Sequence, residues 1–169
     1  KLISNGDKRY TRHIEKSEII ADAKVRSYAV TPVYINRPTE SAMTPKILFN
    51  PFVVETESDD EIAASLAHEA AHVHMGHLND QHLYWDKKIK NYHLKNIADD
   101  LIINEELKQA GILKGIATEE FGLFLDNPYQ ISSRKSWKTI ILDYWGREIY
   151  DDDLTEDRIY ETLIKKVKV

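Results

Sequence analysis

A cluster of histidines in one short apolar stretch is the part of this sequence best suited to chemistry. Residues 66–77 read LAHEAAHVHMGH and hold four of the seven histidines of the chain. Among them, His68, Glu69 and His72 form the pattern His-Glu-x-x-His. Residues four apart on a helix differ by about 40° in projection, so both imidazoles can bind one ion. Zinc lowers the pKa of a bound water towards 7, and an adjacent carboxylate can take its proton. The pattern therefore predicts one Zn²⁺ held by His68 and His72, with Glu69 as general base.

The other two histidines of this stretch point away from such an ion if the helix is unbroken. Relative to His68, His74 projects at about 240° and His77 at about 180°. A third histidine ligand in the extended zinc pattern would need Gly at position 75 and His at position 78, where the chain has Met75 and Leu78. We therefore expect His77 to cap or pack the far side of the helix, and His74 to be a satisfied polar residue.

A third metal ligand is expected, because a catalytic zinc site has three protein ligands and one position for water. The chain has no cysteine, so the ligand must be an imidazole or an oxygen donor. Residues 96–104 read NIADDLIIN. In helical projection Asp100 lies within the apolar arc, whereas Asp99 lies on the solvent-exposed side. A buried carboxylate is costly unless it is paired or metal-bound. Asp100 is the predicted third ligand; the alternative is that it orients a metal-bound histidine.

Further polar side chains are candidates for supporting roles near this site. Asn96 and Asn104 project into the same arc as Asp100, one turn to either side, and we expect them to hydrogen-bond the metal ligands or to serve as alternative oxygen donors. A donor to the developing oxyanion is also usual, and three residues lie in plausible sequence range: Tyr84, Tyr92 and His93. The acidic residues expected to be ordinary solvated charges are Asp99, Glu105 and Glu106.

Composition narrows the class of protein. The 169 residues suffice for a single domain spanning 1–169, and the net charge of -5 includes no basic stripe that would follow a nucleic acid. No apolar run approaches the roughly 20 residues that cross a bilayer. The first residues, KLISNGDKRY, lack the apolar core of a signal peptide. We expect a cytoplasmic protein with no nucleic acid or membrane partner.

The first half of the chain must supply the elements that position the histidines. Helical spacing predicts a helix over 14–29, and β-branched and aromatic runs predict strands over 31–36 and 46–55. Pro51 in the second run fits an edge strand or a strand end. Ser58 and Glu61 form a capping box, so a helix beginning near Asp59 carries the histidines.

The second half is predicted to be helical. A helix over 93–110 stops at Gly111, residues 114–131 form a loop, and helices follow over 133–145 and 155–167, the last one capped by Thr155. The three tryptophans are expected in the core or in packing. The whole reads as an α+β fold, mainly helical with a small sheet, whose helical C-terminal part begins at about residue 128.

These pieces together resemble the zincin metallopeptidases, and within them the bacterial and phage putative metallopeptidase domain that often precedes a von Willebrand factor A-like domain. The matching segments are ILFNPFVVE, the histidine stretch, and NIADDLIIN. A weaker likeness continues through EEFGLFLD to LTEDRIYETL, so the resemblance covers most of the chain from about Lys46. In the similar membrane-associated gluzincins, the third ligand is a Glu four residues before an Asp. This chain has Asn96 and Asp100 at those positions, which shifts the ligand role to Asp100.

The resemblance implies a zincin fold, with a small sheet packed on the active-site helix and an edge strand, assigned to 47–50, beside the metal. Such an edge can take an extended peptide by strand addition. It implies zinc-dependent hydrolysis of a peptide or protein substrate, and a von Willebrand-like domain or separate regulatory protein as partner. Two alternatives stay open: a non-catalytic or regulatory binding module stapled by zinc, and a hydrolase of non-peptide amides.

Overall fold

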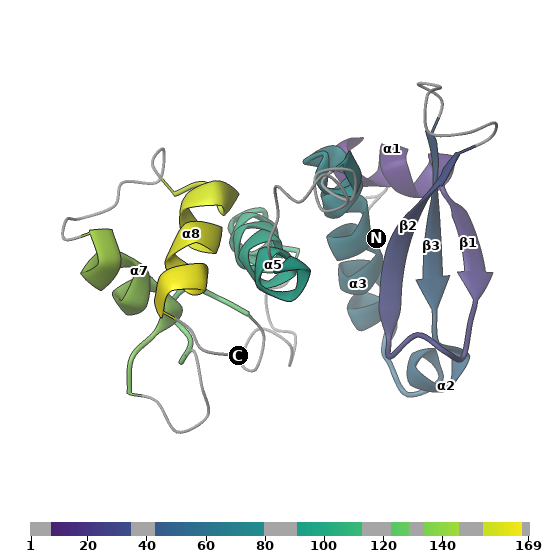
Figure 1. The fold of residues 1–169 in the computed structure, drawn as a ribbon. Coiled ribbons are helices and arrows are strands. Elements are labelled where there is room, and N and C mark those ends of the chain that lie inside the picture. The colour runs from purple at the N-terminus through teal and green to yellow at the C-terminus, as the bar shows by residue number, and fades with distance from the viewer. Residues whose placement is uncertain are drawn as a thin grey trace. The chain divides into compact units, whose positions relative to one another are not determined.

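The computed structural model describes residues 8–34, 43–79, 91–112, 123–128, 134–145 and 154–166, and within these the side chains of 32–34, 43–44 and 79 are left aside. The chain divides into two compact units, Lys1–Gln81 and His82–Val169 (Figure 1), and each is described by itself. The single domain expected from chain length stays a prediction.

A three-stranded sheet forms one layer of the first unit. Its strands are β1 (Glu18–Ala21), β2 (Tyr28–Tyr34) and β3 (Met43–Phe49), in the order β1-β3-β2. β1 pairs with β3 in parallel, and β2 pairs with β3 antiparallel along its whole length. Figure 1 shows β3 between the two other strands. Of the strand predicted over 31–36, residues 31–34 are confirmed as part of β2, and residues 35–36 lie outside the described residues.

The helix predicted over 14–29 is wrong, because only its first residues are helical. Helix α1 (Lys8–Lys16) ends before β1, in which Ile19 and Ile20 align with Ile47 and Leu48 of β3. Asp22 then turns the chain, since its side chain accepts a hydrogen bond from the amide of Lys24 at 2.9 Å. The spacing of 14–29 resembled a helix, but its β-branched pair is used in a sheet whose partner strand lies far along the chain.

The strand predicted over 46–55 ends at Phe49, and it is not an edge. Asn50 caps a short helix, α2 (Pro51–Val54), by accepting a hydrogen bond from the amide of Phe52 at 3.0 Å. Proline at the first position of a helix loses no hydrogen bond, which explains the change from strand to helix at Pro51. Because β3 is paired on both sides, the edge assigned to 47–50 is corrected: β3 is the middle strand.

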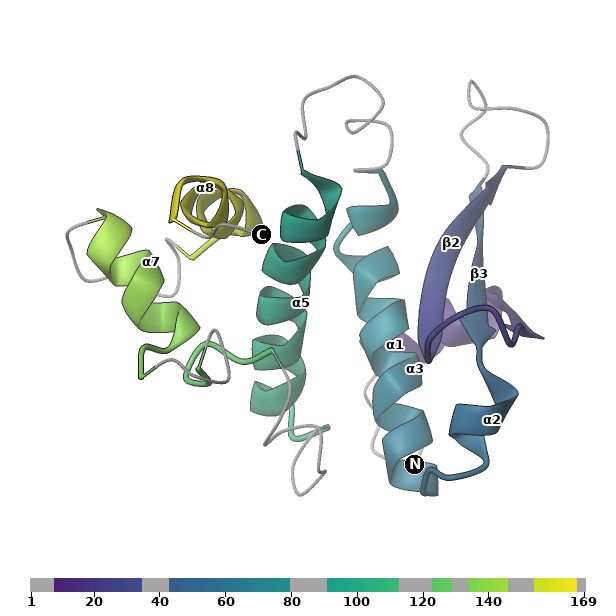
Figure 2. The same cartoon turned by 60° about the horizontal axis from the view of Figure 1, so that its bottom comes forward.

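Helix α3 (Asp59–His74) forms the second layer of the first unit and carries the histidine stretch. It packs against β2, β3 and α1, and Figure 2 shows it beside β2. Small side chains allow this close approach, since Ala64, Ala67, Ala70 and Ala71 are all buried. The chain continues into a short 3-10 helix, η1 (His77–Asn79).

The described residues of the second unit lie mainly in helices. Helix α5 (Tyr92–Gln109) and helix α7 (Trp137–Trp145) both pack against helix α8 (Glu156–Lys166). The buried core is made of Leu94, Ala98, Leu101, Leu125, Trp137, Ile141, Ile159 and Leu163, with Trp145 packed against it. The prediction that the tryptophans serve packing is thus confirmed for Trp137 and Trp145; Trp85 lies outside the described residues.

The ends of these helices follow local signals in the sequence. Gly111 has a φ of 76° just after the end of α5, and Thr155 accepts a hydrogen bond from the amide of Arg158 at 3.3 Å at the start of α8. Helix α7 begins at Trp137 instead of residue 133, because Ser136 accepts from the amide of Thr139. Residues 123–128, inside the predicted loop, contain no helix.

The architecture is mixed α and β, mainly helical with a small sheet, as predicted. Across the described ranges, the helices fall short of the length and apolar character needed to cross a membrane.

Candidate metal site

The start of α3 is held by two sets of hydrogen bonds. The amide of Glu61 donates to Ser58 Oγ at 3.2 Å, and the amide of Ser58 donates to Glu61 Oε2 at 2.8 Å, which is the predicted capping box. Just before the cap, Tyr28 of β2 donates from its hydroxyl to Glu57 Oε2 at 2.7 Å. Burial, followed by this hydrogen bond, raises the pKa of Tyr28 above its ordinary value. The hydrogen bond from Tyr28 therefore fixes the N-terminal end of α3 to the sheet.

His68 and His72 lie one turn apart on one side of α3. Their ring centroids are 5.0 Å apart, and nitrogen atoms of the two rings lie within 4.8 Å of one another. His72 is buried, with 8% of its surface exposed, and His68 is half-buried. Two neutral imidazoles at this spacing suit a zinc ion, which prefers nitrogen ligands and tolerates partial burial. The pair that the spacing predicted is thus brought together.

Glu69 follows His68 directly and is also buried, with 8% of its surface exposed. An ionised carboxylate is rarely so buried unless it is paired or beside a metal. Glu69 thus lies in the same part of α3 as the two histidines. At this position its carboxylate could take a proton from a water molecule held between them.

His77 contacts His72, which corrects the prediction that it caps or packs the far side of the helix. The Nδ1 atoms of the two rings are 3.1 Å apart, and both rings are buried. The projection assumed an unbroken helix, but α3 ends at His74 and Gly76 has a φ of 75°. The chain therefore turns back and brings His77 beside His72. Gly76, one residue earlier, was the sequence signal that could have indicated this turn.

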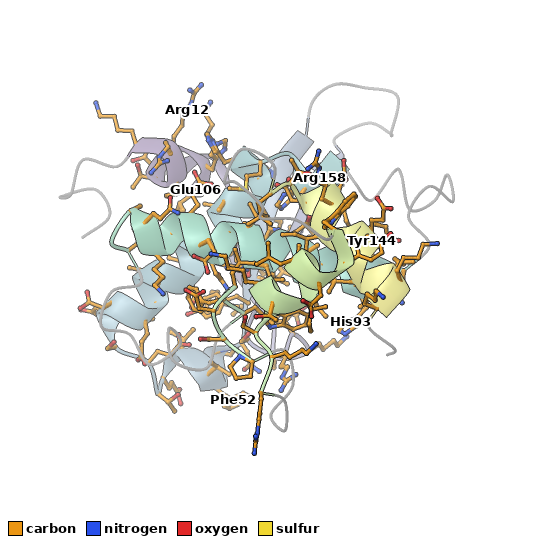
Figure 3. All side chains as sticks on the ribbon, turned by 90° about the vertical axis from the view of Figure 1, so that its left-hand side faces the viewer. Arg12, Phe52, His93, Glu106, Tyr144 and Arg158 are labelled. Atoms are coloured by element: carbon orange, nitrogen blue, oxygen red, sulfur yellow. The ribbon has the colours of Figure 1, made fainter. Side chains whose placement is uncertain are left out.

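His74 lies apart from this group and contacts α1, as its predicted role as a satisfied polar residue requires. Its Nδ1 is 3.2 Å from Nε2 of His13. Burial, followed by the charges of His74, Arg12 and Lys16, lowers the pKa of His13. Figure 3 labels Arg12, which lies on the same helix as His13. The pair of His13 and His74 fastens α1 to α3.

Asp100 lies on α5, in the second unit, and is half-buried. Its role as the third metal ligand, together with His68 and His72, stays a prediction. Its neighbour Asp99, expected on the wet side, is instead buried at 4% exposure and forms an ion pair with Lys95, which is equally buried. Buried apolar residues occupy two opposite sides of α5, so the helix is covered on more than one side. The helical projection assumed one buried side, and it was therefore wrong for Lys95 and Asp99. The spacing of four between Lys95 and Asp99 was the signal that could have indicated their pairing.

The other candidates on α5 differ in their surroundings. Asn96 is exposed, although the projection placed it in the buried arc. Asn104 donates from its side chain to the carbonyl of Leu123 at 3.2 Å, and Glu105 accepts from the amide of Leu125 at 2.8 Å. Glu105 is therefore no ordinary solvated charge; with Asn104 it holds the segment 123–125 against the helix. Glu106 is half-buried rather than fully solvated.

The predicted oxyanion donors are only partly described. Tyr92 is 37% exposed, and His93, labelled in Figure 3, is exposed on the first turn of α5. Tyr84 lies outside the described residues. Their role stays a prediction.

Comparison with known proteins identifies a family for the chain. No curated protein and no solved structure matches the chain. One family, described as a putative metallopeptidase domain, matches residues 12–165 and so includes the histidine stretch and all of α5. The match confirms the resemblance drawn from the sequence motifs. The chain belongs to the putative metallopeptidase domain family.

Proposed function

We propose that this protein is a zinc-dependent metallopeptidase that hydrolyses peptide bonds. The observation that carries the proposal is the arrangement on α3, where His68 and His72 share one side of a capped helix and buried Glu69 directly follows His68. Membership of the putative metallopeptidase domain family supports the same activity. Asp100 is proposed as the third ligand, because it supplies the carboxylate that this donor set lacks.

The chemistry assigns Glu69 both proton transfers. When bound, zinc would lower the pKa of a water molecule and polarise the substrate carbonyl. The Glu69 carboxylate accepts a proton from the water as its oxygen attacks the carbonyl carbon. The same carboxyl then donates that proton to the leaving amine nitrogen, so that the C–N bond breaks and Glu69 returns to its ionised form.

Strand β2 is the proposed binding edge for the substrate. In the part of the chain that the structure describes, β2 pairs with β3 alone, and it packs beside α3. An exposed strand edge offers unpaired amides and carbonyls to an extended peptide. We therefore propose that β2, in place of the segment 47–50, aligns a peptide or protein substrate along the histidine helix.

The replacement Glu69→Gln tests the proposal. It removes the proton acceptor while keeping the shape of the side chain, so turnover of a peptide library should fall by about 10²–10⁴-fold while zinc still binds. The matched control is Glu55→Gln, an exposed glutamate of the same unit, which should leave turnover unchanged.

The non-catalytic alternative makes the opposite prediction. A zinc-stapled binding module has no use for a general base, so Glu69→Gln would then change nothing measurable. Cleavage by that variant at the parent rate, or cleavage by the parent that a chelator does not abolish, would rule out the metallopeptidase.

A further inference from the structure

The contact between His72 and His77 is independent of the pattern that identified the metal site. Their Nδ1 atoms are 3.1 Å apart, their ring centroids are 5.2 Å apart and their planes are inclined by 68°. His77 is 6% exposed and His72 is 8% exposed, so water has little access to this hydrogen bond. Buried polar contacts of this kind fix both partners in one orientation.

The end of α3 is built to make this contact. The amide of Met75 still donates to the carbonyl of Ala71, and the amide of Gly76 donates to that of Val73. Gly76 then takes a φ of 75°, which L-residues with side chains rarely adopt. The 3-10 turn η1 begins at once and starts with His77. The chain thus reverses within three residues, and His77 lies back against His72 in the last turn of the helix.

The hydrogen bond decides which nitrogen of His72 can bind a metal. Only one of two facing Nδ1 atoms carries the shared proton when both rings are neutral. If Nδ1 of His72 is the donor, its Nε2 carries no proton and can offer its lone pair to the ion, and Nδ1 of His77 is the acceptor. Metal-ligating histidines usually donate their second nitrogen in this way, most often to a carboxylate or a carbonyl.

We propose that His77 is a positioning residue for His72. It accepts the Nδ1 proton of His72, fixes that ring in the tautomer with Nε2 unprotonated, and holds its plane towards the metal position. The inference rests on the metal site of the proposed function, but not on peptide hydrolysis. It assigns no ligand role to His77.

The test replaces His77 and measures zinc affinity by competition with a chromophoric chelator. His77→Ala should bind zinc about 10–100-fold more weakly than the parent. His77→Gln should recover most of this loss, because its side-chain carbonyl can accept the same proton. The matched control is His74→Ala, which removes a histidine two residues away that contacts His13 instead of His72, and it should leave zinc affinity unchanged.

A second measurement separates positioning from general support of the fold. Long-range ¹H–¹⁵N spectra of the zinc-loaded parent should show the proton of His72 on Nδ1 and that of His77 on Nε2. This spectrum needs only the parent protein, so the proposal is tested even if His77→Ala does not fold.

The remaining outcomes are distinct. Unchanged zinc affinity in His77→Ala, or a proton on Nε2 of His72, overturns the inference alone. A loss as complete as in His68→Ala would make His77 a ligand and also overturns it. A parent that binds zinc with the expected tautomers but cleaves no peptide removes the proposed function and keeps the inference. A parent that binds no zinc removes both.

Discussion

At the scale of single residues, four histidines of one short stretch have different surroundings. The rings of His68 and His72 lie edge-on to one another, His77 contacts His72, and His74 contacts His13 on another helix. The spacing of four predicted the first pair, since it depends only on helical geometry. The position of His77 depends on where the helix ends, and periodicity carries no information about that.

His13 makes the stability of the first unit depend on pH. Burial, then the neighbouring positive charges, lowers its pKa from the ordinary value of 6.5. The unfolded chain therefore binds this proton more readily than the folded one. The stabilising contribution is complete above about pH 6.5 and is lost as pH falls through the lowered pKa.

The replacement His13→Gln removes this titration. In metal-free protein, its denaturant midpoint should fall less than that of the parent between about pH 7.5 and pH 5. Equal slopes of midpoint against pH in the two proteins would show that His13 contributes nothing to the acid sensitivity.

The ion pair of Lys95 and Asp99 is expected to be sensitive to the loss of one partner. Both side chains are buried, so Lys95→Met leaves a buried carboxylate without its cation. We expect the free energy of unfolding to fall by about 3–5 kcal/mol in that variant. The double replacement Lys95→Met with Asp99→Leu should recover much of the loss, because no charge is then left unpaired. Denaturant unfolding measures both values; a single variant as stable as the parent would contradict the burial of the pair.

At the scale of elements, the capping box decides how firmly α3 begins. Ser58→Ala removes the acceptor for the amide of Glu61 and should lower the free energy of unfolding by about 1 kcal/mol. Ser27→Ala, at an exposed serine in the turn before β2, is the control and should change stability by less than about 0.5 kcal/mol. Similar losses in the two variants would mean that the cap adds nothing specific to the helix.

The accuracy of prediction differs between helices and strands for a physical reason. The start of α3 and the end of α5 depend on adjacent residues, Ser58 with Glu61 and Gly111 after the last turn, and these were predictable. Strand β1 exists because its residues pair with residues of β3 that lie much further along the chain, such as Glu18 with Lys46. Local spacing contains no record of that pairing, so 14–29 was predicted as one helix.

At the scale of the whole molecule, the family and the mixed α and β architecture were predictable from motifs, since these combine signals from most of the chain. The position of β3 in the middle of the sheet was not, because strand order depends on which segments meet in space. The substrate-binding edge that we propose is therefore β2, in place of the segment 47–50 of β3. The ligand set of His68, His72 and Asp100 takes residues from both units and is a proposal. It can be tested directly.

The most direct test is anomalous diffraction at the zinc absorption edge from crystals grown with zinc. We expect one strong peak at about 2.0–2.1 Å from a nitrogen of His68, from Nε2 of His72 and from a carboxylate oxygen of Asp100. A peak bound to the two histidines but closed by another residue would exclude Asp100 as the third ligand. The absence of a peak at His68 and His72, in crystals that contain zinc, would contradict the assignment of a catalytic metal to α3.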